Sequence, residues 1–280
     1  MHRLLKGLQS LGHQIRVIAH NAQISEHDGI DIYPHGGGET LFTTNNDHCE
    51  WADVIFTQLI GSPHGYNKAK QHGKPLIFFA HNMSKHYCVN DALVVYNSNY
   101  TAGLKLFPNE STILQPLTPI GEQSHGKKIA LINCNMNKGG QQFVELSRRL
   151  RQYDFIGYMG GYGEQITGGY VDYRQNGEID WSEIGLLLVP SEFESWSQVA
   201  TEAICHGIPV IANDLPALRE NLSYAGIYID RSDLDAWVKT IDYLMWDKSK
   251  QVELCLKRAK ELDPEPRLLK FNYWLCNMIK

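Results

Sequence analysis

The sequence lacks the residue patterns that mark metal sites and disulfide frameworks. Its six cysteines include no Cys-x-x-Cys pair, and its twelve histidines include no His-Glu-x-x-His pattern. We therefore expect no metal ligands among the site residues. Several cysteines stand in apolar surroundings, as is typical of buried free thiols, so we expect the reducing environment of a cytoplasmic protein.

Long apolar runs and an excess of positive charge are also missing. No stretch approaches the 18 apolar residues of a membrane-spanning helix, and the amino end lacks the charged-then-apolar pattern of a signal peptide. The formal net charge is −5 and the isoelectric point is about 6.2. These totals do not favour an electrostatic grip on nucleic acid.

What remains is the composition of an ordinary globular protein, with 43% apolar and 20% charged residues. A chain of 280 residues is long enough for about two domains. Strand-like and helix-like segments alternate throughout, which predicts an α/β fold with parallel sheets. The Pro-, Gly- and Ser-containing stretch Thr118–Lys127 is typical of a linker.

The most informative segment carries Glu194 and Glu202, eight positions apart. The apolar run Leu186–Pro190 predicts a strand, and the helical pattern that bears Glu202 ends at Gly207. Glu194 then lies in the loop at the carboxyl end of a strand, where open α/β sheets bind ligands. Two carboxylates there can accept hydrogen bonds from sugar or ribose hydroxyls, and the helix amino end can bind phosphate. The alternative is that both glutamates are solvated surface charges.

Two further residues, Lys138 and His81, have the same two interpretations, a binding role or a surface role. Lys138 follows a predicted strand and precedes a helix, beside Gly139 and Gly140, which permit close approach of a ligand to the backbone. His81 follows the apolar strand Pro75–Ala80 at its carboxyl end. Each is either a ligand contact or an ordinary loop residue.

The segment around the two glutamates resembles the nucleotide-sugar motif of retaining glycosyltransferases, in particular glycosyltransferase family 4. That motif reads roughly P-S-x-x-E-G-F-G-x-x-x-x-E-A-x-A-x-G-x-P-V-I-A. The matching residues are Pro190, Ser191, Glu194, Glu202, Ala203, Gly207, Pro209, Val210, Ile211 and Ala212. The chain departs from it at Ser195-Trp196-Ser197, where the family has Gly-aromatic-Gly. The resemblance is strong from about Lys128 to Asp230 and weak before that.

The resemblance implies the GT-B architecture, in which two Rossmann-like domains face each other across a cleft. It assigns residues 1–120 to an acceptor-side domain, residues 121–265 to a nucleotide-sugar-binding domain, and residues 266–280 to a helix that packs back on the first domain. In the family a first strand and a Gly-rich loop precede the segment that matches Met1–Val17. This chain opens directly on that helix, so we expect a first domain shortened at its amino end, either by truncation or as a minimal variant.

The resemblance also implies roles for individual residues. Lys138 would neutralise the departing diphosphate, and Asn133 stands where the family has an arginine. Glu202 would bind the ribose hydroxyls and Glu194 those of the donor sugar, while His81 would contact the transferring sugar. Further donor-binding positions implied by it are Gly139, Gly140, Gly161, Glu178, Ile179, Ser195, Trp196, Ser197, Gln198 and Val199, with Asn176 and Gly177 in the segment that frames the base.

The implied activity is transfer of a hexose from a nucleotide-diphosphate sugar with retention of configuration. UDP-glucose and GDP-mannose are both used in the family. We find no Asp-x-Asp triplet in the setting that holds a cation with a diphosphate, and expect a metal-independent front-face reaction without a cofactor. The acceptor stays open between a saccharide, a lipid, a small molecule and, less favoured, a nucleic-acid base, as for some phage-borne transferases.

Three alternatives stay open. The chain could be a non-catalytic nucleotide- or sugar-binding protein that kept the fold, or another enzyme of this architecture, such as an epimerase. The leucine stripe of Met1–Leu11 could serve a peripheral membrane contact, although such a stripe more often packs on a sheet. The oligomeric state is not encoded in any of these patterns.

Overall fold

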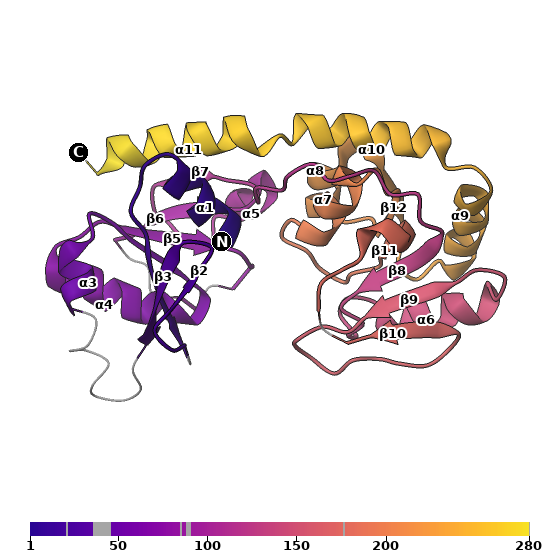
Figure 1. Ribbon diagram of the computed structural model, residues 1–280. Helices are drawn as coiled ribbons and strands as arrows, with labels where there is room; N and C mark the ends of the chain where they lie inside the picture. The colour runs from indigo at the N-terminus through magenta and orange to yellow at the C-terminus, as the bar shows by residue number, and fades with distance from the viewer. Residues whose placement is uncertain (21, 36–45, 85, 88–90, 176, 280) are drawn as a thin grey trace. The chain divides into compact units, whose positions relative to one another are not determined.

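The computed structural model describes residues 1–20, 22–35, 46–84, 86–87, 91–175 and 177–279. The chain forms two compact units. Unit 1 is Met1–Leu117 together with Pro264–Lys280, and unit 2 is Thr118–Asp263. Each unit consists of helices packed on a mostly parallel β-structure, as Figure 1 shows.

Unit 2 is built on one six-stranded sheet in which every neighbouring pair is parallel. Its order is β10-β9-β8-β11-β12-β13. Counted along the chain this is the 3-2-1-4-5-6 order of a doubly wound fold, whose ligand crevice opens where the order reverses, here between β8 and β11. The strands are β8 (Lys128–Ile132), β9 (Phe155–Tyr158), β10 (Val171–Arg174), β11 (Ile184–Val189), β12 (Val210–Asn213) and β13 (Gly226–Ile229).

Helices cover both faces of this sheet. One face carries α6 (Gly140–Arg149) and α9 (Leu234–Trp246), which share a core cluster with it. The other carries α7 (Gln198–Cys205), α8 (Pro216–Leu222) and α10 (Ser249–Glu261), which share a second cluster. All six residues of β11 are buried, which explains why that strand is a continuous apolar run in the sequence. Two short 3-10 helices, η3 (Trp181–Glu183) and η4 (Ser223–Ala225), precede β11 and β13.

The described part of unit 1 contains two smaller sheets. The three-stranded sheet has the order β1-β3-β2, from β1 (Arg16–His20), β2 (Ser25–His27) and β3 (Ile30–His35), with β2 antiparallel to β3. The four-stranded sheet is parallel and has the order β4-β5-β6-β7. Its strands are β4 (Ile55–Gln58), β5 (Leu76–Ala80), β6 (Leu93–Tyr96) and β7 (Ser111–Ile113).

The antiparallel hairpin of β2 and β3 departs from the expected all-parallel pattern. Asp28 and Gly29 form its two-residue loop, with φ of 51° and 74°. Two consecutive left-handed residues are the mark of a type I′ turn, for which Asp-Gly is a preferred pair. The Asp28-Gly29 pair is therefore a turn signal that the sequence itself carries.

The described residues of unit 1 form the helices α1 (His2–Ser10), α3 (Asn46–Trp51), α4 (Ser62–His72), α5 (Asn99–Gly103) and α11 (Pro264–Met278), with a 3-10 helix, η2 (Leu59–Gly61), before α4. The Gly-, Ser- and Pro-containing segment Leu59–His64 predicts a loop, but these residues are helical in the structure, where Pro63 suits the first turn of α4. The Gly36–Gly38 turn expected from the sequence lies outside the described residues.

The apolar stripe of α1 is used inside unit 1. Leu4 and Leu8 are buried in one cluster with Phe271 and Leu275 of α11 and with residues of β5 and β6. Gly7 lets the two helices approach closely, since a Cβ there would lie 2.6 Å from Leu268 Cδ2. These two leucines are thus not available for the membrane contact considered from the sequence. Among the described helices, none has both the length and the apolar character needed to cross a bilayer.

Two leucines of α11 test its place in the core of unit 1. We expect Leu275→Ala to lower the free energy of unfolding by about 2–5 kcal/mol, because Leu275 is 2% exposed and the substitution leaves a cavity. Leu269→Ala is the matched control, since Leu269 lies on the same helix but is 47% exposed. Urea titrations followed by circular dichroism measure both. Equal losses would contradict this packing.

Candidate functional site

Two charged side chains meet at the carboxyl edge of the unit 2 sheet. Lys138 comes from the loop after β8 and Glu194 from the loop after β11, and these strands are neighbours. The Lys138 Nζ donates to Glu194 Oε1 at 2.6 Å, and Ser191 Oγ donates to the same oxygen at 2.9 Å. The Glu194 side chain is only 8% exposed. An ion pair therefore lies at the reversal of strand order, where this fold binds ligands.

The loop that carries Lys138 packs directly against the loop that follows the neighbouring strand, β11. Gly139 has a φ of 88°, and a Cβ there would lie 2.4 Å from Pro190 Cγ. A Cβ on Gly140 would lie 2.1 Å from the carbonyl oxygen of Cys134. The Lys138 amide donates to Asn135 Oδ1 at 2.9 Å. Both glycines are thus required by packing, which is what brings the lysine to Glu194.

The turn before α7 is held in place by hydrogen bonds of buried side chains. Trp196 is buried in the core, where its Nε1 donates to Thr201 Oγ1 at 2.9 Å. Asn221 Nδ2 donates to the carbonyl oxygens of Trp196 and Ser197 at 2.6 and 2.8 Å. Trp196 was predicted to be a donor-binding position, and the structure places its side chain in the core of unit 2. No local pattern in the sequence pointed to Asn221.

Ser197 holds an uncommon backbone conformation at the start of α7. Its φ is 70° and its ψ is 85°, in the left-handed region that favours glycine. Its hydroxyl is buried and has no hydrogen-bond partner within the described residues. Gln198 and Val199 form the first turn of α7, whose N–H groups have no acceptor within the helix. This end of α7 therefore presents a hydroxyl and backbone donors suited to an anion.

The second glutamate has a different environment from the first. Glu202 lies in the middle of α7, is partly exposed, and accepts a hydrogen bond from Gln198 Nε2 at 3.0 Å. Glu194 is buried and ion-paired. The two carboxylates flank the first turn of one helix, and their unlike surroundings suit them to different partners.

Asn133 and Gly161 border the loop after β8. Asn133 has a φ of 64°, and its Oδ1 accepts a hydrogen bond from Gln165 Nε2 at 3.0 Å. Gln165 Oε1 in turn accepts from the Gly160 amide at 2.8 Å. Asn133 thus shapes this loop, as asparagine tolerates the left-handed region. Gly161 is exposed beside it.

A second cation that we did not predict lies near Lys138. Arg231 follows β13 at the same edge of the sheet, and its Nη2 lies 3.5 Å from the carbonyl oxygen of Met136. Its Nη1 lies 3.5 Å from Glu192 Oε2. The signal in the sequence was its place after an apolar strand. Arg231 supplies positive charge on a sheet edge where Asn133 has none.

The other predicted donor-binding positions have differing degrees of exposure. Glu178 is exposed, and Ile179 packs against the core cluster below α7. Asn176 lies outside the described residues. Ser195 lies between Glu194 and the Trp196-Ser197 turn, and it is partly exposed.

His81 belongs to unit 1, at the carboxyl end of β5. Its ring stacks on Phe79 with centroids 6.0 Å apart, and its carbonyl oxygen accepts from Asn97 Nδ2 at 3.4 Å. Burial lowers the pKa of His81 to about 4, and the amino group of Met1 adds to the effect. The imidazole is therefore neutral at neutral pH.

Comparison with known sequences gives one short match and no family. No protein-family model matches the chain. An uncharacterized 41.2 kDa protein in the cps region of Klebsiella pneumoniae is 33% identical over 88 residues, which is 30% of this chain and 24% of that protein. The match thus spans about a quarter of the relative's own length.

Solved structures identify the fold. Sucrose-phosphate synthase from Thermosynechococcus elongatus has a TM-score of 0.79 at 15% identity, over 99% of this chain and 92% of its own. Anabaena HepE in complex with UDP-glucose has a TM-score of 0.72 at 15% identity, over 89% and 85%. A glycosyltransferase from Rickettsia africae has a TM-score of 0.72 at 13% identity, over 99% and 93%. The chain has the α/β GT-B fold of such glycosyltransferases.

The seating of the Lys138 loop can be tested by a single methyl group. We expect Gly139→Ala to destabilise the protein by about 1–3 kcal/mol, through overpacking against Pro190 and the unfavourable φ. Gly103→Ala is the control, because a Cβ there meets nothing within 4 Å. Thermal unfolding measures both, and equal melting temperatures of Gly139→Ala and wild type would contradict the packing.

The lowered pKa of the partly buried His81 predicts a pH dependence of stability. Between the ordinary histidine pKa of 6.5 and the folded value of about 4, the unfolded chain binds the proton more tightly. Stability must then fall as the pH drops through this window. We expect His81→Gln to lose less stability than wild type between pH 7 and pH 4.5 in parallel melts. Parallel curves for the two proteins would refute the shift.

Proposed function

We propose that this protein is a retaining glycosyltransferase that moves a hexose from a nucleotide-diphosphate sugar to an acceptor. The observation that carries the proposal is the Lys138–Glu194 pair at the strand-order reversal, next to the open first turn of α7. A diphosphate joined to a sugar needs a cation and a helix amino end for its phosphates and a carboxylate for its sugar hydroxyls. This site brings all three groups together.

The diphosphate is assigned to Lys138 and the amino end of α7. The lysine brings charge, while the Ser197 hydroxyl and the first N–H groups of α7 bring directed donors. Stabilising the negative charge that develops on the leaving diphosphate is the main electrostatic demand of the reaction. Arg231 is the second cation in this scheme, in place of the charge that Asn133 lacks.

The two glutamates are assigned to the hydroxyl groups of the donor. Within the described residues, both hydrogen bonds to Glu194 end on Oε1, which leaves Oε2 for the transferring sugar. Glu202, partly exposed on α7, is assigned to the ribose. Holding the sugar by fixed partners orients its anomeric carbon for attack. Gly161, Glu178, Ile179 and Ser195 are assigned to the nucleotide and the loops around it.

The proposed reaction is a front-face displacement without a metal ion. The bond from the anomeric carbon to the phosphate oxygen breaks while the acceptor oxygen bonds to the same face of that carbon. The leaving phosphate oxygen takes the acceptor's proton, so the reaction needs no separate base. His81 contacts the transferring sugar as a neutral hydrogen-bonding group, consistent with its lowered pKa.

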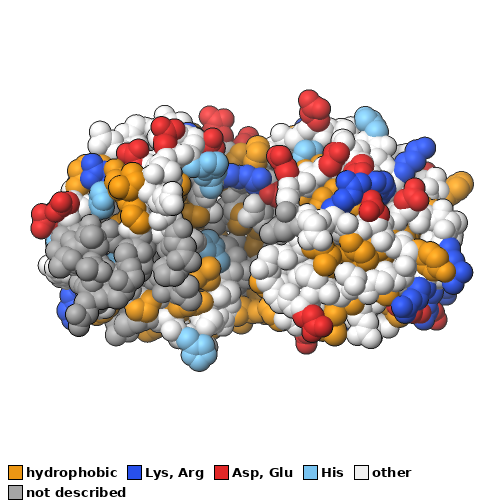
Figure 2. All heavy atoms as spheres, turned by 60° about the horizontal axis from the view of Figure 1, so that its bottom comes forward, with side chains coloured by type: hydrophobic (Ala, Val, Ile, Leu, Met, Phe, Trp, Pro, Cys, Tyr) orange, Lys and Arg blue, Asp and Glu red, His pale blue; other side chains and the backbone are white. Residues whose placement is uncertain are grey.

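UDP-sugars are the first donors to test, because Anabaena HepE was solved with UDP-glucose and pneumococcal GtfA with UDP and GlcNAc. GDP-mannose is the second, since the motif serves both bases. A saccharide, lipid or small molecule is favoured over nucleic acid as acceptor. On the face that Figure 2 shows, acidic and basic side chains are interspersed rather than gathered into a basic track.

A non-catalytic binding protein is the second candidate function. The serines at 195 and 197 and the asparagine at 133 are the departures that favour it. Such a protein would bind the donor but neither transfer nor hydrolyse its sugar. Measuring UDP release from UDP-glucose by the wild-type protein separates the two functions.

Single substitutions test the assignment. We expect Lys138→Ala and Glu202→Ala each to lower donor turnover by about 100-fold or more, since each removes a group that holds the departing diphosphate or the ribose. The measurement is UDP release in the presence of candidate acceptors, with UDP-glucose, UDP-GlcNAc and GDP-mannose as donors.

Two exposed residues of α10, Lys250 and Glu253, provide matched controls. Lys250→Ala and Glu253→Ala carry the same changes of charge and should keep wild-type turnover. Wild-type turnover by Lys138→Ala or Glu202→Ala, with circular dichroism unchanged, would refute the assigned roles.

A further inference from the structure

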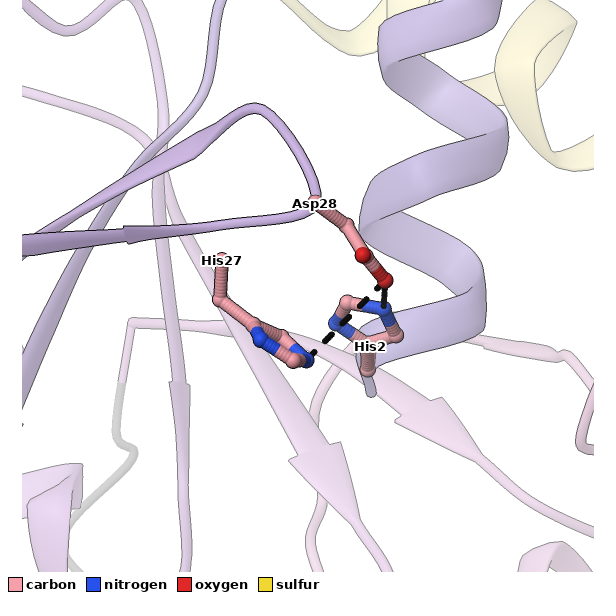
Figure 3. Close-up of side chains that lie close together, drawn as sticks. All are labelled: His2, His27 and Asp28. Atoms are coloured by element: carbon pink, nitrogen blue, oxygen red, sulfur yellow. Dashed lines mark hydrogen bonds and ion pairs between the residues drawn. The ribbon is translucent and has the colours of Figure 1, made fainter.

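Three side chains that are distant in the sequence meet on the surface of unit 1. His2 opens α1, while His27 and Asp28 lie at the tip of the β2–β3 hairpin. Figure 3 shows the two imidazole rings and the carboxylate turned toward one another. One donor atom from each lies within 4.8 Å of the other two, and all three residues are exposed.

The geometry is already close to that of a ligand set. His2 Nε2 lies 2.9 Å from Asp28 Oδ2, and His27 Nε2 lies 3.9 Å from the same oxygen. Zinc bonds of 2.0–2.2 Å in a tetrahedral arrangement place ligand atoms about 3.3 Å apart. Rotation of exposed side chains is enough to close the difference. An ion would replace the direct hydrogen bond between His2 and Asp28.

The backbone that carries these ligands is held in place. His27 and Asp28 are fixed by the type I′ turn, in which Asp28 and Gly29 are both left-handed. Gln9 Nε2 donates to the Gly29 carbonyl at 2.5 Å, and Lys6 Nζ donates to the Asp28 carbonyl. These contacts bind the turn to α1. A site built on rigid elements loses little entropy when it binds an ion.

The donor atoms decide which ion fits. Two imidazole nitrogens and one carboxylate oxygen suit zinc and its neighbours in the first transition row, whereas magnesium and calcium prefer oxygen ligands alone. Three protein ligands leave a fourth position for water. The charge of Lys6 near the turn weakens the attraction without blocking the donors. The histidines are too far apart in sequence for their spacing to have revealed this group.

We propose that His2, His27 and Asp28 form a zinc-class metal site that fastens the β2–β3 hairpin to α1. The ligands of this site belong to unit 1, whereas the donor-binding residues proposed above belong to unit 2. The site is therefore independent of the proposed transferase activity and of the expected metal-independent reaction.

Zinc titration of the chelator-treated full-length protein tests the site. We expect one Zn²⁺ per chain by isothermal titration calorimetry, with at least about tenfold weaker binding in His27→Gln and in Asp28→Asn, because each loses one of three ligands. Added zinc should also raise the melting temperature of the wild type but not of these variants.

His125→Gln is the control for general imidazole binding, since His125 is an exposed histidine of unit 2. It should bind zinc like the wild type. His2→Gln, on a different element, repeats the test if a hairpin variant fails to fold. No measurable binding by the wild type, or equal affinity in wild type, His27→Gln and His2→Gln, would overturn the proposal.

Discussion

The ion pair between Lys138 and Glu194 is the constraint around which the candidate site is arranged. A carboxylate that is only 8% exposed is costly to bury unless its charge and lone pairs are satisfied. Lys138 supplies the charge and Ser191 a hydroxyl, both on one oxygen. A donor that brings its own phosphates and hydroxyls can enter this arrangement by exchanging partners with charges that are already in place, so little reorganisation is needed on binding.

The surrounding backbone is shaped to permit that pair. Gly139 rests on Pro190 at a distance that no side chain would allow, and Ser197 stays left-handed because Asn221 holds its carbonyl from below. Uncommon backbone conformations persist only where the structure over-determines them, and they gather at functional sites. Here Asn133, Gly139 and Ser197 are all left-handed, and all three lie in loops at one edge of the sheet.

The parts of this arrangement that local patterns encode were readable from the sequence. The buried run of β11 and the helical repeat of α7 placed Glu194 in a loop and Glu202 on a helix, as the structure has them. The parts that depend on contacts between distant residues were not readable. Asn221 donates to the turn before α7 from more than twenty positions further along the chain. Arg231 follows β13, yet it contacts the carbonyl oxygen of Met136 in the loop after β8.

Two other departures have more local causes. Trp196 stands at the aromatic position of the motif that the segment resembles, and its indole packs in the core, where it donates a hydrogen bond to Thr201. Strand β10 lies at the edge of its sheet with alternating partly buried and exposed residues, so it lacks the continuous apolar run of an inner strand. The fold comparison at 13–15% identity agrees with this view, since architecture persists where little sequence does.

The central claim is that Lys138, Glu194 and the amino end of α7 together hold the diphosphate and sugar of the donor. A crystal structure of the protein with a bound UDP-sugar tests it most directly. The account predicts phosphate oxygens within hydrogen-bond distance of Lys138 Nζ and of the first N–H groups of α7, with a sugar hydroxyl on Glu194. A nucleotide bound elsewhere, with the Lys138–Glu194 pair undisturbed and distant from it, would contradict the account.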